Sequence, residues 1–296
     1  MPTGGLLAVV AHALVYSPCS KAMRNQSRLT DCDFADDVGM LATTKPALQR
    51  MTISLEEEAA KVGLRISAEK TKVLTINRKT KANITVGDKK IEEVKQFTYL
   101  GSVMTGDGGS DEDVDARIGK AAAVFKRMRP MWSSASINEG IKIRLFTTII
   151  VPTALYGCET WRHTERIAKK LNVFQQRCLR RIFRISYLEH KTNDKVLKRA
   201  NVHQLEAIVT ERRMRLAGHV LRMNDDRHPK TAMRWTPRNG KRRVGAPRIT
   251  WRRTFIKDLE DSQDPNIRWV DAEQIAADRR NWRSLVARCA GMHGGN

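Results

Sequence analysis

Apolar and polar residues alternate on both sides of a pair of aspartates near the start of the chain. Between Arg28 and Ala42 the period is two residues, which is typical of strands with one buried face. The alternation breaks at Asp36 and Asp37. The pattern therefore predicts a β-hairpin that carries these two acids at its tip.

A helical repeat follows the hairpin. Thr44 suits the N-cap, Pro46 suits the first turn and Gly63 suits the end of a helix. Between them, apolar residues recur at steps of three and four, namely Leu48, Met51, Leu55, Ala59 and Val62. Residues 45–63 are therefore predicted to form an amphipathic helix.

Short extended segments are predicted after this helix. Residues 64–67 and 72–76 have strand character, and Gly87-Asp88 is a turn signal between residues 83–86 and 90–94. Residues 97–104 add one more extended segment, broken at Gly101. Residues 28–110 are thus expected to be α+β, with a helix packed on a small antiparallel sheet.

Beyond residue 110 the period becomes helical. Apolar stripes start at Val114, Ile141, Leu171 and His203, and a last helical region runs over residues 250–290 with a break at Pro265. Residues 235–248 are rich in helix breakers and basic side chains, which predicts a basic loop. We divide this part into a helical region, residues 111–190, and a basic helical C-terminal region, residues 191–296.

The charge of the chain points to a polyanionic partner. It has 54 Lys and Arg against 32 Asp and Glu, a formal net charge of +22. Residues 1–160 hold 22 basic and 18 acidic side chains, so the remaining 32 and 14 leave +18 on residues 161–296. Such a surface binds nucleic acid in a salt-sensitive, largely sequence-independent way.

The cysteines, an apolar segment near the N-terminus and the tryptophans add expectations about compartment and partners. The five cysteines are scattered, which favours free thiols and an intracellular protein, in the nucleus or in a cytoplasmic ribonucleoprotein. Leu6–Val15 is apolar but has no preceding Lys or Arg and is too short to span a membrane, so a short helix is expected there and no membrane partner. Of the six tryptophans, Trp235 and Trp251 are the candidates for stacking on bases, because they flank the basic loop.

The segment Phe34-Ala35-Asp36-Asp37 carries the candidate chemistry. Carboxylates on a turn can hold Mg²⁺, and nucleotidyl transfer uses two such ions to activate a hydroxyl and stabilise the leaving pyrophosphate. Aspartates also cap turns without any catalytic role, so the segment alone leaves both interpretations open.

The segment resembles motif C of reverse transcriptases, and the residues after it keep the order of that family. Residues 45–63 resemble the palm helix, residues 64–77 (with Ser67-Ala68-Glu69-Lys70-Thr71-Lys72) resemble motif D, and Phe97–Gly101 resembles the primer grip. The series is similar to non-LTR retrotransposons of the LINE type, particularly RTE-like elements. It continues through Leu155–Trp161 into a thumb-like region and a basic tail.

The resemblance implies RNA-directed DNA synthesis with Mg²⁺ and deoxynucleoside triphosphates, on an RNA template and a DNA primer or target. Asp36 and Asp37 would be the catalytic metal ligands, and Tyr99, Leu100 and Gly101 would position the primer end. The expected nucleic-acid-binding residues lie on a basic helix and in the basic loop: Lys169, Lys170, Arg177, Arg180, Arg181, Arg184, Lys241, Arg242, Arg243 and Arg248.

The chain also departs from the family. Residues 1–27 do not match the expected palm approach, and the further metal-binding aspartate and the fingers have no counterpart in the sequence. We therefore expect a fragment that does not polymerise alone. The alternatives are a noncatalytic RNA- or DNA-binding protein derived from such an element and, less favoured by the charge, a helical scaffold for protein partners.

Overall fold

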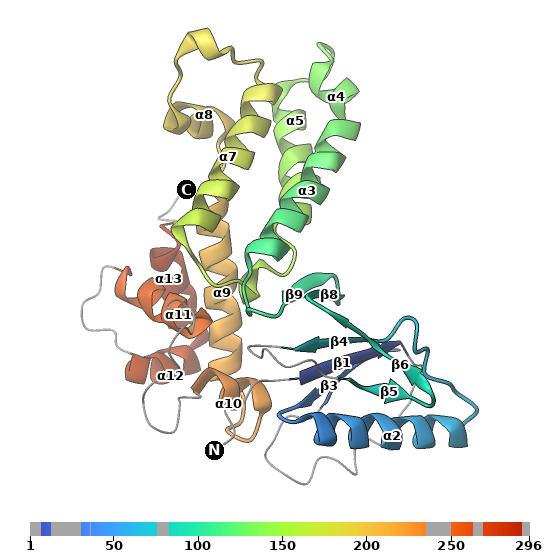
Figure 1. Ribbon diagram of the computed structural model, residues 1–296. Coiled ribbons are helices and arrows are strands. Elements are labelled where there is room, and N and C mark those ends of the chain that lie inside the picture. The colour runs from blue at the N-terminus through green and yellow to red at the C-terminus, as the bar shows by residue number, and fades with distance from the viewer. Residues whose placement is uncertain are drawn as a thin grey trace. The chain divides into compact units, whose positions relative to one another are not determined.

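The computed structural model describes residues 7–12, 31–35, 37–75, 83–234, 250–262 and 269–291, and in 7–12 only the backbone. The chain divides into two compact units, Met1–Asp113 and Val114–Asn296. The first unit holds small sheets and one long helix, and the second is helical (Figure 1). The predicted α+β class, with a mainly helical remainder, is confirmed.

The main sheet of the first unit has the strand order β2-β3-β1-β4-β7. Its neighbouring strands are antiparallel except β4 and β7, which are parallel, so the sheet is mixed and not purely antiparallel. Its strands are β1 (Leu7–His12), β2 (Asp31–Phe34), β3 (Asp37–Ala42), β4 (Lys72–Thr75) and β7 (Glu92–Val94).

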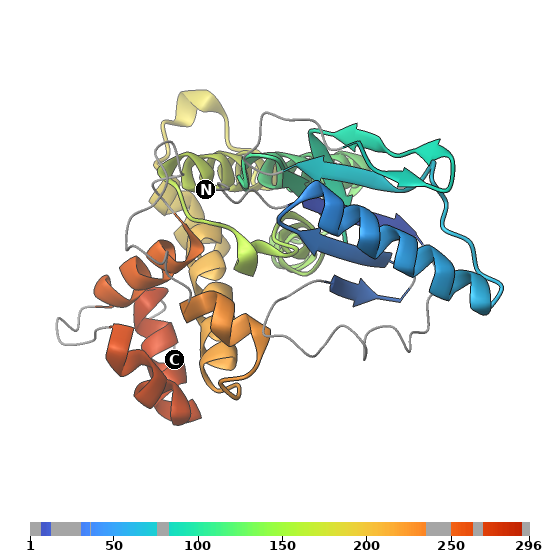
Figure 2. The same ribbon diagram turned by 60° about the horizontal axis from the view of Figure 1, so that its bottom comes forward.

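Helix α2 (Lys45–Lys61) lies along this sheet, as Figures 1 and 2 both show. It begins where predicted, because the Thr44 side chain accepts a hydrogen bond from the Ala47 backbone N–H. Its apolar stripe, with Leu48 and Leu55 buried, packs against Val38, Met40 and Val73 of the sheet. The predicted helix is thus confirmed.

Two hairpins complete the unit. One joins β5 (Thr85–Val86) and β6 (Lys89–Lys90), and the other joins β8 (Gln96–Tyr99) and β9 (Ser102–Thr105). Leu100 and Gly101 have φ of 49° and 81°, the left-handed values that a two-residue hairpin turn requires. The predicted extended segment 97–104 is therefore a hairpin.

Two expectations were wrong here. The apolar run near the N-terminus contains strand β1 and not a helix, since a short continuous apolar run suits a strand with neighbours on both sides as well as it suits a helix. Residues 64–67 form no strand and lead into a turn at 68–70.

The second unit is built around one helix, α9 (Leu205–Leu221), that belongs to two cores. Its first half joins a core with α7 (Glu165–Ile182), and its second half joins another with α11 (Trp251–Glu260), α12 (Trp269–Ala277) and α13 (Arg279–Cys289). The finer division at residue 190 stays a prediction.

The remaining helices of this unit are shorter, apart from the first. They are α3 (Asp111–Arg127), which starts just ahead of the boundary, α4 (Arg129–Ser133), α5 (Glu139–Leu145), the π-helical turn Phe146–Ile150, α6 (Val151–Ala154), α8 (Asn193–Ala200) and α10 (His228–Arg234). The predicted stripes fall on α3, on α5 with the π-helical turn, on α7 and on α9, whereas α8 and α10 were not predicted. In the part of the chain that the structure describes, no helix is both long enough and apolar enough to span a bilayer.

Candidate nucleic-acid interface

Strands β2 and β3 form the predicted hairpin, and Asp37 lies at its tight turn. Phe34 pairs with Asp37 across the hairpin, which leaves a two-residue loop, and Ala35 adopts a positive φ of 53°. Asp37 is half-buried at the first position of β3, and Asp36 lies outside the described residues. On the other side of β3, the backbone of His12 in β1 is the register partner of Asp37.

The segment predicted to resemble a primer grip contacts this hairpin. The Tyr99 hydroxyl donates a hydrogen bond of 2.9 Å to the Cys32 carbonyl of β2. The ring lies beside Gly39, where an added Cβ would be in ordinary contact with Tyr99 Cζ at 3.7 Å and closer to the Cys32 oxygen, at 3.3 Å. Burial, with added repulsion from Asp37, raises the pKa of Tyr99, so its hydroxyl stays a neutral donor. Leu100 and Gly101 form the turn that follows.

The described residues do not by themselves complete a magnesium site. Within them, no group of three or more His, Cys, Asp or Glu side chains could hold a metal ion. Of the predicted pair, only Asp37 is described, and one carboxylate does not fix two ions. The described cysteines, Cys32, Cys158, Cys178 and Cys289, are free thiols, as expected.

In the second unit, the predicted basic residues of α7 line an open groove of about 1000 Å³, whose other wall comes from α3. Both helices are labelled in Figure 1. Residues three or four apart lie on one face of a helix, so these side chains form a continuous cationic stripe. Five of the six predicted residues of α7 and its C-terminal end line the groove: Lys170, Arg177, Arg180, Arg181 and Arg184. Lys169 is exposed but does not line it.

The opposite wall of the groove adds apolar residues, Ile118, Ala122, Phe125 and Trp132, beside the charged Asp115 and Lys126. Phe125 of α3 stacks on Trp132 with ring centroids 4.9 Å apart, and the Trp132 N–H donates to the Phe125 carbonyl at 2.8 Å. Val173 of α7 is 50% exposed between the basic side chains. The groove therefore combines a charged rim with fixed apolar surface.

The basic side chains of the stripe differ in their hydrogen-bond and ion-pair partners. Lys170 forms an ion pair of 2.7 Å with Asp115 of α3, and Arg180 donates to the Lys191 carbonyl at 2.8 Å. Arg184 donates to the Ser133 carbonyl. Arg177 and Arg181 are exposed and form no ion pair within the described part of the chain. These two guanidinium groups are free to contact a ligand.

One thiol in the groove has no chemical role of its own. Burial raises the pKa of Cys178 to about 12, despite the charge of Arg177 next to it. A thiol with this pKa is neutral near pH 7 and is not a nucleophile.

Other predicted residues lie elsewhere. Lys241, Arg242, Arg243, Arg248 and Trp235 fall outside the described residues. Trp251 was expected to stack on bases, but its ring stacks on Phe255 and its N–H donates to the Glu159 carbonyl at 2.7 Å. It belongs to the core, because a buried indole needs a partner for its N–H and finds one there.

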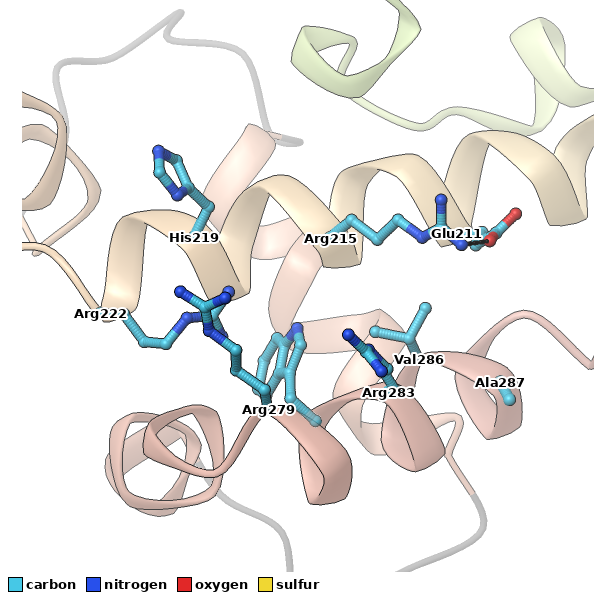
Figure 3. Close-up of a pocket in the computed structure, with 9 residues that line it drawn as sticks. Glu211, Arg215, His219, Arg222, Arg279, Arg283, Val286 and Ala287 are labelled. Carbon is cyan, nitrogen blue, oxygen red and sulfur yellow. Dashed lines mark ion pairs between the residues drawn. The ribbon is translucent and has the colours of Figure 1, made fainter.

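The sequence analysis missed a second group of basic residues, on α9 and α13. Arg215, His219 and Arg222, on α9 and at its C-terminal end, line a cavity of about 660 Å³ together with Arg279 and Arg283 of α13. Figure 3 shows Arg222 close to Arg279. Their helical spacing along each segment was visible in the sequence. Nothing local in the sequence indicates that the two segments pack together.

Comparison with known proteins agrees with the class suggested by the hairpin and its neighbours. Residues 1–104 match the model of a family described as reverse transcriptase (RNA-dependent DNA polymerase). The match begins at residue 1, so it includes residues 1–27, where the motifs gave no resemblance. The N-terminal unit is therefore similar to reverse transcriptases.

A relative extends the similarity over most of the chain. A transposon-derived protein of Caenorhabditis elegans is 25% identical over 274 residues, which cover 89% of this chain and 97% of the relative. The similarity thus includes the helical unit as well as the first 104 residues. The chain is distantly homologous to a transposon-derived protein.

Proposed function

We propose that this chain is the palm and thumb part of a reverse transcriptase from a non-LTR, LINE-type, RTE-like retrotransposon. In this proposal it grips an RNA template and a DNA primer or target through the groove between α3 and α7. The observation that carries the proposal is the pair Arg177 and Arg181, exposed and without ion-pair partners among the described residues, on the wall of that groove. Guanidinium groups placed in this way bind backbone phosphates, and the apolar residues of the groove offer contact to sugars and bases.

The hairpin unit supports the polymerase origin. The Tyr99 hydroxyl bond to Cys32 joins two segments 67 residues apart, and these are the segments that resemble the primer grip and motif C. In the proposal, Asp36 and Asp37 are the catalytic carboxylates that bind Mg²⁺, and Tyr99, Leu100 and Gly101 position the primer end. Deoxynucleoside triphosphates would be the second substrate.

The main sheet also supports the expectation that this chain does not extend a primer alone. The family takes a further metal-binding aspartate from an upstream strand, and the upstream strand beside β3 here is β1. Its sequence, LAVVAH, has no carboxylate, and His12 is the register partner of Asp37. Because two metal ions need carboxylates from more than one strand, we expect no primer extension by this chain alone.

The test is primer extension by the full chain with Mg²⁺ on an RNA template, beside filter binding to the same template and primer. Binding without extension supports the proposal. Extension that Asp36→Ala abolishes would show a complete polymerase site and contradict the limit on activity. Absence of binding would contradict the groove's role.

A noncatalytic nucleic-acid-binding protein derived from such an element is the second candidate. It is favoured by the same groove, since gripping a duplex needs neither Asp36 nor Asp37. The two candidates predict different results when a reverse transcriptase fingers-and-palm segment is added separately. Such a segment would restore primer extension only if Asp36 and Asp37 take part in catalysis.

A further inference from the structure

The groove between α9 and α13 contains arginines that no acid among the described residues neutralises. Figure 3 shows the two helices with Arg222 near Arg279 at one end and Glu211 near Ala287 at the other. Arg215 pairs with Glu211 at 2.6 Å. For Arg222, Arg279 and Arg283 the described residues supply no carboxylate partner.

Basic residues of α10, in contrast, form ion pairs with acidic residues. On α10, Lys230 lies 2.9 Å from Asp225 and 3.2 Å from Glu273, and Arg234 also pairs with both acids. Asp225 and Glu273 thus form ion pairs with α10 and not with the arginines of the groove. The positive charge is concentrated where α9 and α13 face each other.

Close packing of α9 and α13 holds these two helices in place. Gly218 of α9 lets α13 come so close that an added Cβ would lie 2.1 Å from Trp282 Nε1. The Trp282 N–H donates to the Met214 carbonyl at 2.9 Å, and Arg222 donates to the Ala276 carbonyl at 3.0 Å. Partial burial and the charge of Arg279 lower the pKa of Arg222, so the two cations repel each other. An anion between them would relieve this repulsion.

We infer that the groove between α9 and α13 is a second phosphate-binding site, which takes the phosphodiester backbone of a nucleic-acid strand. Arg279 and Arg283 are four residues apart, about 6 Å along α13, so their guanidinium groups can contact separate phosphates. Guanidinium groups bind phosphate oxygens in two-pronged pairs. The indole of Trp282 is buried and cannot stack on a base, so contact is with the backbone and without sequence preference.

This inference goes beyond the groove of α3 and α7 and does not depend on it. The two sites can be separated with Arg177→Gln/Arg181→Gln on one side and Arg279→Gln/Arg283→Gln on the other. A control for the second pair is Arg280→Gln/Lys198→Gln, which removes the same charge from exposed positions that line neither groove.

The test is site-resolved modification of the full chain with phenylglyoxal, an arginine reagent, read by mass spectrometry with and without a single-stranded oligonucleotide. The oligonucleotide is expected to protect Arg279 and Arg283 but not Arg280. In binding titrations, Arg279→Gln/Arg283→Gln should weaken affinity roughly ten-fold and flatten the salt dependence by about 1 unit of slope, whereas the control pair should change the slope little.

Three outcomes would overturn the inference. The first is an oligonucleotide that protects none of the groove arginines. The second is protection by pyrophosphate but not by the oligonucleotide, which would indicate a small phosphate compound. The third is equal protection by poly-glutamate, which would indicate an acidic protein partner. Protection of Arg279 that persists in Arg177→Gln/Arg181→Gln would support the second site independently of the groove of α3 and α7.

Discussion

Gly218 lies on the face of α9 that α13 covers, and it sets how closely these helices approach. An added Cβ would lie 2.1 Å from Trp282 Nε1, far inside van der Waals contact. We expect Gly218→Ala to lower the free energy of unfolding by about 1 to 3 kcal/mol through overpacking. Urea denaturation followed by circular dichroism would measure it.

Gly119 provides the matched control for this substitution. It lies on the exposed face of α3, and nothing within 4 Å would meet its Cβ. Gly119→Ala should stabilise the chain by about 0.5 to 1 kcal/mol, because alanine loses less backbone entropy in a helix. A stabilising effect of Gly218→Ala as well would show that α13 does not pack on α9 as described.

The buried pair of Arg213 and Asp258 gives a prediction about pH. Arg213 Nε lies 3.1 Å from Asp258 Oδ2 between α9 and α11. Burial raises the pKa of Asp258 from 3.8 to about 6, and the charge of Arg213 opposes this only in part. The folded state therefore binds the proton more tightly than the unfolded state does.

The stability from this group is full below about pH 4 and is lost as the pH rises through about 6. Asp258→Asn should remove that part of the pH dependence. Denaturation midpoints of the two proteins across this pH range would measure the difference. Parallel pH profiles would mean that Asp258 titrates at an ordinary pKa.

At the residue scale, the sequence indicated candidate residues but not their partners in the fold. The acids at the hairpin turn and the cationic stripe of α7 follow from short periods and motifs. The pair of Arg213 and Asp258 does not, because the two residues are far apart in sequence and no local pattern joins them. The groove of α9 and α13 was missed for the same reason.

At the scale of elements, the contact between the β8–β9 hairpin and β2 depends on one hydroxyl. Tyr99→Phe would leave the Cys32 carbonyl without this donor. We expect a loss of about 0.5 to 1.5 kcal/mol in the stability of the N-terminal unit. Backbone amide exchange in β8 and β9 should become faster, as NMR would show, while exchange in α7 stays unchanged.

Equal exchange rates in Tyr99→Phe and the unchanged chain would contradict the proposed link between the two segments. This comparison also separates a local contact from a global loss of stability, because α7 belongs to the other unit. A change in both units would indicate that they unfold together.

The elements themselves were predicted where their period was long. Helix α2 and the stripes of α3, α7 and α9 follow from repeats of three and four residues, and the cap at Thr44 follows from its type. Strand β1 was predicted as a helix, since its apolar run has no period and its strand form comes from pairing with β3 and β4. Helices α8 and α10 are short, and their few apolar residues, such as Val196, Leu197 and Ala200 of α8, do not repeat over several turns.

At the scale of the whole molecule, the charge of +22 is distributed unevenly, and within the described residues two grooves carry arginines without ion-pair partners. One is the groove of α3 and α7 and the other is the groove of α9 and α13. Composition predicted the polyanionic partner but not these places, because other cations are paired with acids in the fold, such as Lys230 with Asp225.

The most direct test of the account is the salt dependence of binding to an RNA–DNA duplex, measured for three proteins. These are the unchanged chain, Arg177→Gln/Arg181→Gln and the charge-matched control Lys195→Gln/Lys198→Gln on α8. The account predicts that the arginine pair weakens binding roughly ten-fold and flattens the slope by about 1 to 2 units, while the control retains the slope of the unchanged chain. Equal slopes for the two variants would contradict it, because charge alone and not the groove would then account for binding.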